Sequence, residues 1–451
     1  MTSLRLALCA TAFGVLAPLA LPAHAADDAD LAVIRKEMKA LRGDYDRKLR
    51  ELEERLKKAE QRADAAEAQA AKAPSPEVAP AAEVPVAAAP APRAASSANA
   101  FNPAISVILN GSYAVSDDDP AGVGVRGFAL GDEAGLPDRG FSLGESEIAI
   151  SANVDQWFLA NLIVAIGNDD SIAVEEGYVQ TTDLPWGLTV KAGRFFSGIG
   201  YLNEKHAHTW DFSDTPLPYR AMLGNQYGDD GIEVRWLAPT DFFLEFGAEW
   251  FRGDAFPAGG ADDNGAGTVA AFVHTGGDFD EESSFLAGLS YLRTKAVDRD
   301  SGGDLFTGTD DLAIASLVYK WAPNGNPIET NLTVSGEYFF GHEDGTFNGV
   351  GVDYDRSGFY VQGVYQFMPR WRAGVRYAEL HTDDAPLALS GSVLDDFGHT
   401  PRALSALLEY RTSEFGRFRA QYTLDDTDLQ TNDEFVFTYT MAIGAHGAHS
   451  F

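Results

Sequence analysis

Apolar and polar residues alternate along most of the second half of the chain. The clearest case is residues 434–451, which read EFVFTYTMAIGAHGAHSF. Every second residue from Phe435 to Ala445 is apolar, and the residues between them, such as Thr438 and Thr440, are mostly smaller and more polar. A period of two with one apolar face is typical of a strand whose one side meets an apolar medium. We therefore predict that the chain ends in a strand of this kind.

The same alternation recurs upstream in segments that are separated by turn residues. It predicts sixteen strands in all, at 104–115, 141–154, 157–168, 172–182, 187–195, 230–238, 241–252, 268–275, 284–295, 311–322, 330–341, 356–368, 370–381, 402–412, 415–425 and 434–446. Tight junctions such as 185–187 alternate with long acidic loops such as 116–140, 253–267 and 382–400. An even strand count, with short turns at one rim and long loops at the other, indicates an all-β transmembrane barrel of about sixteen antiparallel strands.

The first hundred residues have a different pattern. Residues 1–25 carry Arg5, an apolar stretch and Ala-His-Ala, which predicts a signal peptide that contains the only cysteine, Cys9. Residues 26–72 space apolar positions three and four apart, which predicts an α-helical coiled coil in the periplasm with a self-associating seam. Residues 73–99 are rich in Pro and Ala and predict an extended linker, so the barrel would occupy residues 100–451.

The acidic charge lies almost wholly in the predicted barrel. The chain has a formal net charge of −33, and residues 1–99 carry equal numbers of acidic and basic side chains. Such a surplus argues against a nucleic-acid partner. Only four lysines follow residue 100, namely Lys191, Lys205, Lys295 and Lys320. We therefore expect a modest preference for cations, although inward arginines leave anion transport open.

The order of segments resembles a known family of porins. A signal peptide, a coiled coil, a Pro/Ala spacer and a barrel that ends on Phe451 are similar to the coiled-coil-bearing relatives of the phosphate-selective porins O and P. The stretch LTVKAGRFFSGIGYLNEKHA resembles a strand-to-loop segment of theirs, and the end GAHGAHSF resembles plugless proteins labelled zinc-regulated outer-membrane receptors. The resemblance implies a location in the outer membrane of a Gram-negative bacterium, with Phe451 as an insertion signal for the barrel-assembly machinery.

The third loop, at about 196–229, is the candidate constriction. It is rich in aromatics and proline, which favours an ordered loop, and the resemblance to porins implies that it folds into the lumen. The alternative is an external loop that packs on a neighbouring copy. The candidate constriction residues are Glu204, His206, His208, Asp211, Asp214 and Arg220 from the loop, and Arg372, Arg376, Arg417 and Arg419 from strand faces that are predicted to point inward. These charges either create a transverse field or pair with one another.

Within that loop, His206, His208, Asp211 and Asp214 form a compact set of nitrogen and oxygen donors. His-x-His in an extended segment places both rings on one side, which suits a borderline metal such as zinc. A structural role for the histidines is the competing hypothesis. We expect no tightly bound cofactor, and at most weak zinc binding.

Sequence motifs do not indicate an enzyme. The chain has no phosphate loop and no HExxH. Residues 140–144 match Gly-x-Ser-x-Gly and residues 122–127 match the glycine pattern of a dinucleotide fingerprint, but neither stretch joins a predicted strand to a predicted helix, as both motifs require. The sequence therefore predicts a non-enzymatic, trimeric channel for small solutes in outer-membrane lipid. The alternatives are a zinc or metal-uptake receptor and a structural tether whose coiled coil contacts the cell wall.

Overall fold

The computed structural model describes residues 103–118, 120, 124–131, 134–168, 171–260 and 265–444. The chain divides into two units, Met1–Pro92 and Arg93–Phe451, and all described residues belong to the second. The predicted signal peptide, coiled coil and linker lie outside the described residues, as does the terminal Phe451. Their assignments stay predictions.

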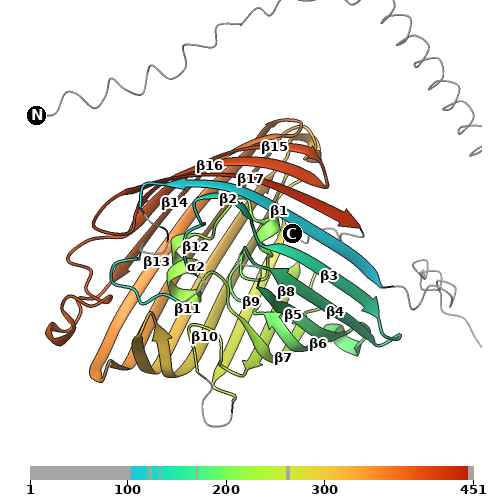
Figure 1. Cartoon of the computed structure of the whole chain (residues 1–451). Helices are drawn as coiled ribbons and strands as arrows, with labels where there is room; N and C mark the ends of the chain where they lie inside the picture. The colour runs from blue at the N-terminus through green and yellow to red at the C-terminus, as the bar shows by residue number, and fades with distance from the viewer. Residues whose placement is uncertain are drawn as a thin grey trace, which may run out of the picture. The chain divides into compact units, whose positions relative to one another are not determined.

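The described part is a closed antiparallel β-barrel (Figure 1). Its strands are β1 (Ala104–Ser116), β2 (Gly140–Leu143), β3 (Ser146–Asn153), β4 (Phe158–Ile166), β5 (Ile172–Thr181), β6 (Leu188–Phe196), β7 (Gly228–Leu237), β8 (Phe243–Phe251), β9 (Thr268–Asp278), β10 (Ser283–Ser301), β11 (Asp304–Trp321), β12 (Asn331–Phe347), β13 (Val350–Met368), β14 (Trp371–Thr382), β15 (Arg402–Ser413), β16 (Gly416–Asp426) and β17 (Asn432–Gly444). Consecutive strands are neighbours, and β17 closes the barrel by pairing with β1 from Ser106↔Gly444 to Ser116↔Glu434.

The seventeen strands make sixteen positions in the wall. Both β2 and β3 pair with β1, β2 against Gly111–Ala114 and β3 against Ala104–Ile108. They are two pieces of one strand, interrupted at Gly144 and Glu145, where the sequence predicted an unbroken strand. The predicted barrel of sixteen antiparallel strands is confirmed.

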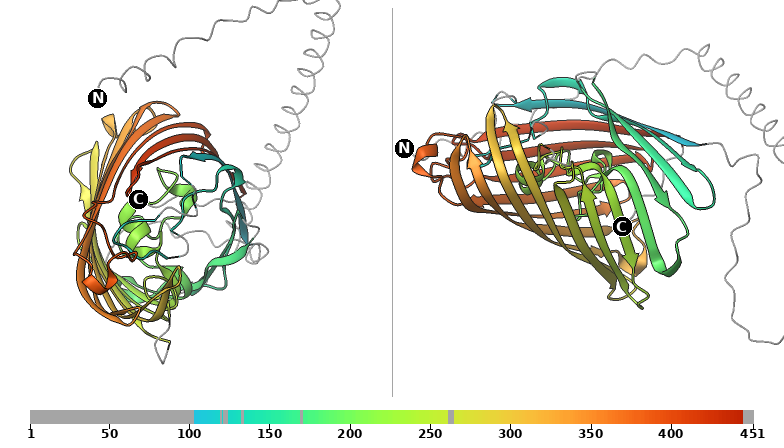
Figure 2. Two further views of the ribbon diagram at one scale, coloured as in Figure 1. Left: turned by 60° about the vertical axis from the view of Figure 1, so that its left-hand side comes forward. Right: turned by 90° about the horizontal axis from the view of Figure 1, so that it is seen from below.

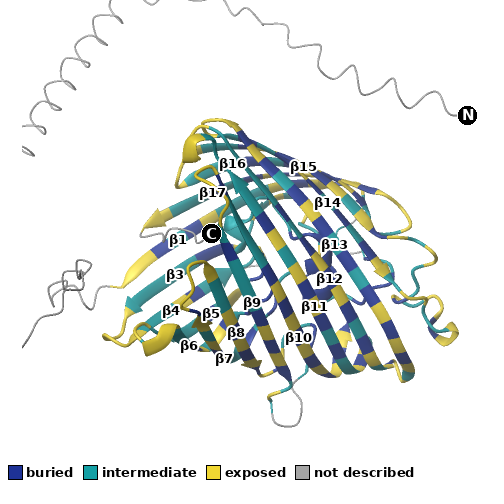
Figure 3. Cartoon of the chain, turned by 180° about the vertical axis from the view of Figure 1, so that it is seen from behind, coloured by how far each residue is buried: buried dark blue, intermediate teal, exposed yellow. Residues whose placement is uncertain are grey.

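The barrel wall is apolar outside and polar inside. Along β17, Phe435 and Phe437 are 40% exposed, whereas Glu434 and Thr438 are 4% and 7% exposed. Figure 3 shows the same alternation of buried and exposed residues along the strands of the outer wall. A water-soluble protein has the opposite arrangement, because water favours polar groups on the surface. The outer face is therefore suited to lipid, as the period-two pattern predicted.

Four strands are longer than the sequence predicted. β10 to β13 run on in two hairpins that turn at residues 302–303 and 348–349. In this extension the inward positions hold ion pairs: Arg299 Nη2 lies 2.9 Å from Glu343 Oε1, and Arg356 donates to Asp310. These four side chains are at most 3% exposed. These charged residues on the inner face made the extensions look like loops in the sequence, so they were not predicted as strands.

Helices are short in the described part of the chain. They are α2 (Leu217–Leu223) and four 3₁₀ turns, η2 (Pro185–Gly187), η3 (Ala207–Thr209), η4 (Pro323–Gly325) and η5 (Leu387–Leu389). Among the described residues, no helix has the length and the apolar character that a membrane span requires. Figure 2 shows α2 inside the ring of strands, so the segment between β6 and β7 positions the candidate site.

Candidate functional site: the inward-folded third loop

The third loop lies in the lumen. It joins β6 to β7 and comprises residues 197–227, and all seven residues of α2 within it are buried. The Tyr219 hydroxyl donates to Glu337 on β12 at 2.8 Å, and the Tyr360 hydroxyl on β13 donates to the same carboxylate at 2.6 Å. The loop therefore contacts strands that are far from its own in the order of the wall (Figures 1 and 2). It does not pack outside the barrel, which was the alternative left open by the sequence.

The first turn of the loop fits only a glycine at position 200. Gly200 has a φ of +67°, and a Cβ there would lie 2.5 Å from the Tyr219 hydroxyl oxygen and 2.7 Å from a Glu337 oxygen. Its amide donates to Ser290 at 3.0 Å. Asn203 then joins both ends of the loop, donating to the carbonyls of Ser197 and Tyr227 at 2.7 and 2.8 Å. These bonds fix the direction in which the chain enters the lumen.

The middle of the loop, at residues 210–214, docks on a basic wall formed by β14 and β16. Arg372 lies 2.5 Å from Asp211, and Arg376 lies 2.7 Å from Asp214 with its guanidinium 4.5 Å from the ring centre of Phe212. Arg417 and Arg419 donate to the carbonyl of Trp210 at 3.1 and 2.6 Å. All four arginines therefore face the lumen and contact the loop.

The pairing decides the ionisation of Asp211. Burial alone would raise the pKa of this carboxyl group, but the charge of Arg372 and its hydrogen bond outweigh burial and hold the pKa below its usual value. The carboxylate therefore stays ionised at neutral pH, which keeps the ion pair intact.

The loop segment before Asp211 docks on an acidic wall formed by β3 and β5. His206 Nδ1 lies 3.2 Å from Glu175 and 3.5 Å from Glu147, and His206 Nε2 lies 3.1 Å from Glu176. His208 Nδ1 lies 2.7 Å from Glu147. Burial alone would lower the pKa of His206, but its hydrogen bonds to Glu175 and Glu176 raise it well above its usual value. The two histidines and the three carboxylates form one cluster.

The four predicted metal donors are not brought together. His206 and His208 lie at the acidic wall, whereas Asp211 and Asp214 each pair with an arginine at the basic wall. The reason is charge complementarity, since a carboxylate is more stable beside a guanidinium than among other carboxylates. The structure thus divides this set between two walls.

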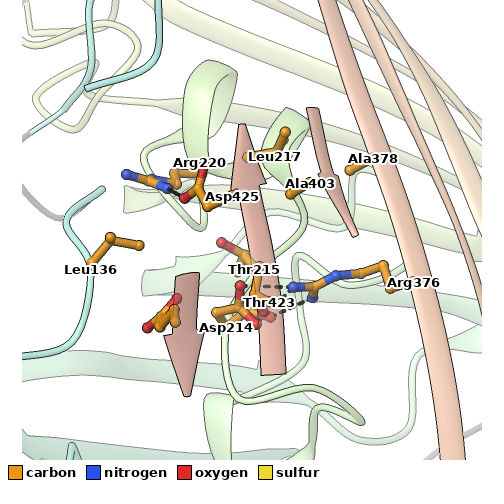
Figure 4. Close-up of a pocket in the computed structure, with 11 residues that line it drawn as sticks. Leu136, Asp214, Thr215, Leu217, Arg220, Arg376, Ala378, Ala403, Thr423 and Asp425 are labelled. Atoms are coloured by element: carbon orange, nitrogen blue, oxygen red, sulfur yellow. Dashed lines mark hydrogen bonds and ion pairs between the residues drawn. The ribbon is translucent and has the colours of Figure 1, made fainter. Parts of the chain in front are cut away.

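The other two predicted loop residues have their own partners. Glu204 pairs with Arg235 and lies 3.6 Å from Lys191 Nζ. Arg220 donates to the carbonyl of Ala134 at 2.6 Å and lies 3.5 Å from Asp425. Figure 4 shows Arg220 and Arg376 on opposite sides of a small pocket that Asp214 and Asp425 also line.

The sequence relatives decide the family. A protein from Aquifex aeolicus (strain VF5), described as uncharacterized, is 30% identical over 334 residues, which cover 68% of this chain and 69% of that protein. The chain belongs to the family of this Aquifex protein. No protein-family model matches the sequence.

One solved porin agrees with the barrel architecture, and two further solved structures are less similar to it. The anion-selective porin from Comamonas acidovorans has a TM-score of 0.50 and 12% identity, over 76% of this chain and 99% of that one. The loop L8 deletion mutant of OmpT from Vibrio cholerae has a TM-score of 0.49 at 13% identity, over 76% and 99% of the two chains. OprB from Pseudomonas putida has a TM-score of 0.46 at 14% identity, over 77% and 95%. Because the identity to the Comamonas porin is only 12%, the likeness establishes the porin-type fold and nothing further.

Sequence reasoning missed the part played by the first loop. The sequence predicted residues 116–140 as a long acidic loop at the rim of the barrel, but Val125 and Phe128 are 3% exposed and pack in the same apolar cluster as Leu217 and Tyr219 of the third loop. The acceptor of the Arg220 bond, Ala134, also belongs to this loop. The only signal was a set of apolar residues in a stretch otherwise rich in Gly and Asp, namely Val123, Val125, Phe128, Leu130 and Leu136.

It also missed the acidic wall. Glu175 and Glu176 are consecutive, so a regular strand would point them to opposite faces. Between β4 and β5 the register shifts: Ile163 pairs with Glu176 and Val164 pairs with Val174, so Glu175 is an extra residue. This β-bulge lets both carboxylates reach His206. A bulge leaves no distinct mark in a single sequence.

Proposed function

We propose that the protein is a porin: a channel of the outer membrane of a Gram-negative bacterium that admits small hydrophilic solutes or ions. The observation that supports this most directly is a barrel whose third loop crosses the lumen and docks on both the acidic wall and the basic wall. The loop narrows the path, and Glu204, the two histidines, the two aspartates and the arginines of the basic wall form its charged border. A channel needs no catalytic centre, and the protein is not an enzyme.

Lipid contact supports the membrane location. The outward residues of β7 and β8 include Ile232, Trp236 and Trp250, which are 56%, 41% and 61% exposed. An apolar band of this kind is unstable in water and stable in hydrocarbon. We further propose that three barrels associate in the membrane, that the coiled coil stands in the periplasm, and that Phe451 serves the barrel-assembly machinery.

The arrangement of charges supports passage of ions without tight binding. Arginines of β14 and β16 face carboxylates of β3 and β5 across the loop, and such opposed charges set up a transverse field. Most of these groups are already paired with loop residues, which favours the passage of monovalent ions without tight binding. The alternative of a purely structural tether to the cell wall predicts no ion current at all.

Planar-bilayer recordings test the channel and the constriction together. The full-length protein with Cys9→Ser should give step currents. In that background, a bulky thiol reagent attached at Glu204→Cys should reduce each step, because the Glu204 side chain is 34% exposed at the loop. The matched control is Leu387→Cys, in the loop 383–401, where the side chain is 94% exposed. The reagent should leave its current unchanged.

Two outcomes would contradict the proposal separately. An absence of step currents in the parent protein would reject a channel. Normal currents that the reagent reduces equally at both positions, or at neither, would keep the channel but show that the third loop does not narrow the path.

A further inference from the structure

Three potential metal ligands converge where the third loop meets the acidic wall. His206 comes from the loop, Glu147 from β3 and Glu175 from β5, and one donor atom of each lies within 4.8 Å of the other two. His206 Nδ1 is 3.5 Å from Glu147 Oε2 and 3.2 Å from Glu175 Oε2. It is the one such group of three or more side chains found among the described residues.

These separations fit a shared ion. A tetrahedral zinc site has bonds of about 2.0–2.2 Å to nitrogen and carboxylate oxygen, so its ligand atoms lie roughly 3.4 Å apart. The two measured separations bracket that value. Imidazole nitrogen and carboxylate oxygen are both donors that zinc accepts, and a site with three protein ligands leaves a fourth position for water.

The surrounding groups already orient His206 as a ligand. Its second nitrogen, Nε2, lies 3.1 Å from Glu176 Oε2. When a cation replaces the proton on Nδ1, Nε2–H still donates to Glu176 and the lone pair of Nδ1 faces the cation between Glu147 and Glu175. Metal-bound histidines usually have their other nitrogen held in this way, because the carboxylate fixes the tautomer and makes the ring a better donor. His208 Nδ1 lies 2.7 Å from the other oxygen of Glu147 and orients that carboxylate.

The β-bulge in β5 is what makes this arrangement possible. Without the extra residue, either Glu175 or Glu176 would face the lipid side of the wall. The site would then lack either the ligand Glu175 or the residue that orients His206, Glu176. The bulge brings both carboxylates to the His206 ring, and the side chains of Glu175 and Glu176 are 12% and 10% exposed.

We propose that His206, Glu147 and Glu175 bind one divalent transition cation of the zinc class, with Glu176 and His208 as orienting residues. The cation joins the third loop to β3 and β5 and fixes that end of the loop against the wall. The site goes beyond the channel function, since a porin needs no resident metal. It also differs from the predicted ligand set, because Asp211 and Asp214 take no part.

Binding of Co²⁺ to the full-length protein in detergent tests the site without reference to conductance. Co²⁺ bound to imidazole and carboxylates gives visible absorption bands, and Zn²⁺ should displace it. We expect one Co²⁺ per chain. The isosteric change Glu175→Gln and the change His206→Gln should each weaken binding more than tenfold.

Two control variants separate this site from other histidines. His342 on β12 lies 2.8 Å from Asp355 and is exposed, so His342→Gln should keep the bands. The double change His446→Ala with His449→Ala should keep them too. Far-ultraviolet circular dichroism and heat-modifiable gel mobility establish that each variant is folded.

The proposal is overturned if the folded parent shows no Co²⁺ bands, which means that only protons occupy His206. It is also overturned if Glu175→Gln and His206→Gln both bind as the parent does, or if the bands follow His446 and His449. Currents recorded in the presence of a chelator test the channel separately, so either proposal can fail alone.

Discussion

Removing Arg376 should release the segment of the third loop that contains Asp214 from the basic wall. The guanidinium donates to the Asp214 carbonyl at 2.8 Å and to both oxygens of its carboxylate at 2.7 Å. The arginine is 4% exposed, and the Asp214 side chain is 33% exposed. Breaking a fully buried pair costs about 3–5 kcal/mol. Because Asp214 is partly solvated, we expect about 2–3 kcal/mol for Arg376→Met.

That free energy sets how often this part of the loop leaves the wall. At about 1.4 kcal/mol for each factor of ten, the undocked population should rise about 30- to 150-fold. Ser213 is a suitable reporter, because its amide donates to Gln421 at 2.7 Å and its hydroxyl is buried in the docked loop. In the Cys9→Ser background, the rate at which a small cationic thiol reagent modifies Ser213→Cys should increase by the same factor.

The control is an arginine in a solvent-exposed ion pair. Arg402 lies 2.9 Å from Asp426 and its side chain is 57% exposed, so Arg402→Met should change the rate less than about threefold. A rise of less than threefold for Arg376→Met would refute the reasoning, since the loop would then be held without help from this ion pair. Equal rises in both variants would indicate a general loosening of the barrel.

Three further predictions follow from the charges and the fold. Reversal potentials should show a modest cation preference at low salt that weakens as salt rises, because the acidic loops act through a field screened within about 10 Å at 0.1 M; strong anion selectivity would contradict it. Deletion of residues 26–98 should leave an SDS-resistant trimer, and a monomer of the full-length protein in native mass spectrometry would contradict that prediction. Because the pKa of Asp211 is lowered in the docked loop, its ion pair with Arg372 stabilises docking fully at a pH above the ordinary aspartate pKa. That stabilisation is lost as the pH falls through the lowered pKa of Asp211. The modification rate of Ser213→Cys, normalised to a free thiol, should thus stay constant from pH 7 to about 4.5 and rise below it.

The wall of the barrel was predictable because its pattern is local. Each strand meets lipid on one face, so period two appears within a few residues, as in Phe435 and Phe437 of β17. The alternation was lost where the inner face carries charge and the outer face also holds polar residues, such as Asp353 and Asp355 of β13. Arg299 and Glu343 are buried against each other in the extended hairpins, yet each looks like a loop residue in the sequence.

The contents of the lumen were predictable only in part. Arg372 and Arg376 were placed inward from alternation alone, and the third loop was expected inside by resemblance. Their partners could not be assigned, because Arg376 and Asp214 are 162 residues apart and nothing local links them. Glu147 and Glu176 were overlooked for the same reason: a carboxylate in a strand becomes part of a site only when the barrel closes.

The order of charges along the third loop explains why it docks in one orientation. Reading from β6, the loop presents His206 and His208 first and Asp211 and Asp214 afterwards, and the walls they meet are acidic and basic in the same order. If the loop were shifted so that its aspartates met Glu147 and Glu175, carboxylates would face carboxylates in a water-poor space, which costs several kcal/mol. Apolar burial of α2 cannot make this distinction, since it is insensitive to direction. The apolar residues therefore hold the loop inside the barrel, and the charges determine which segment of the loop lies against which wall.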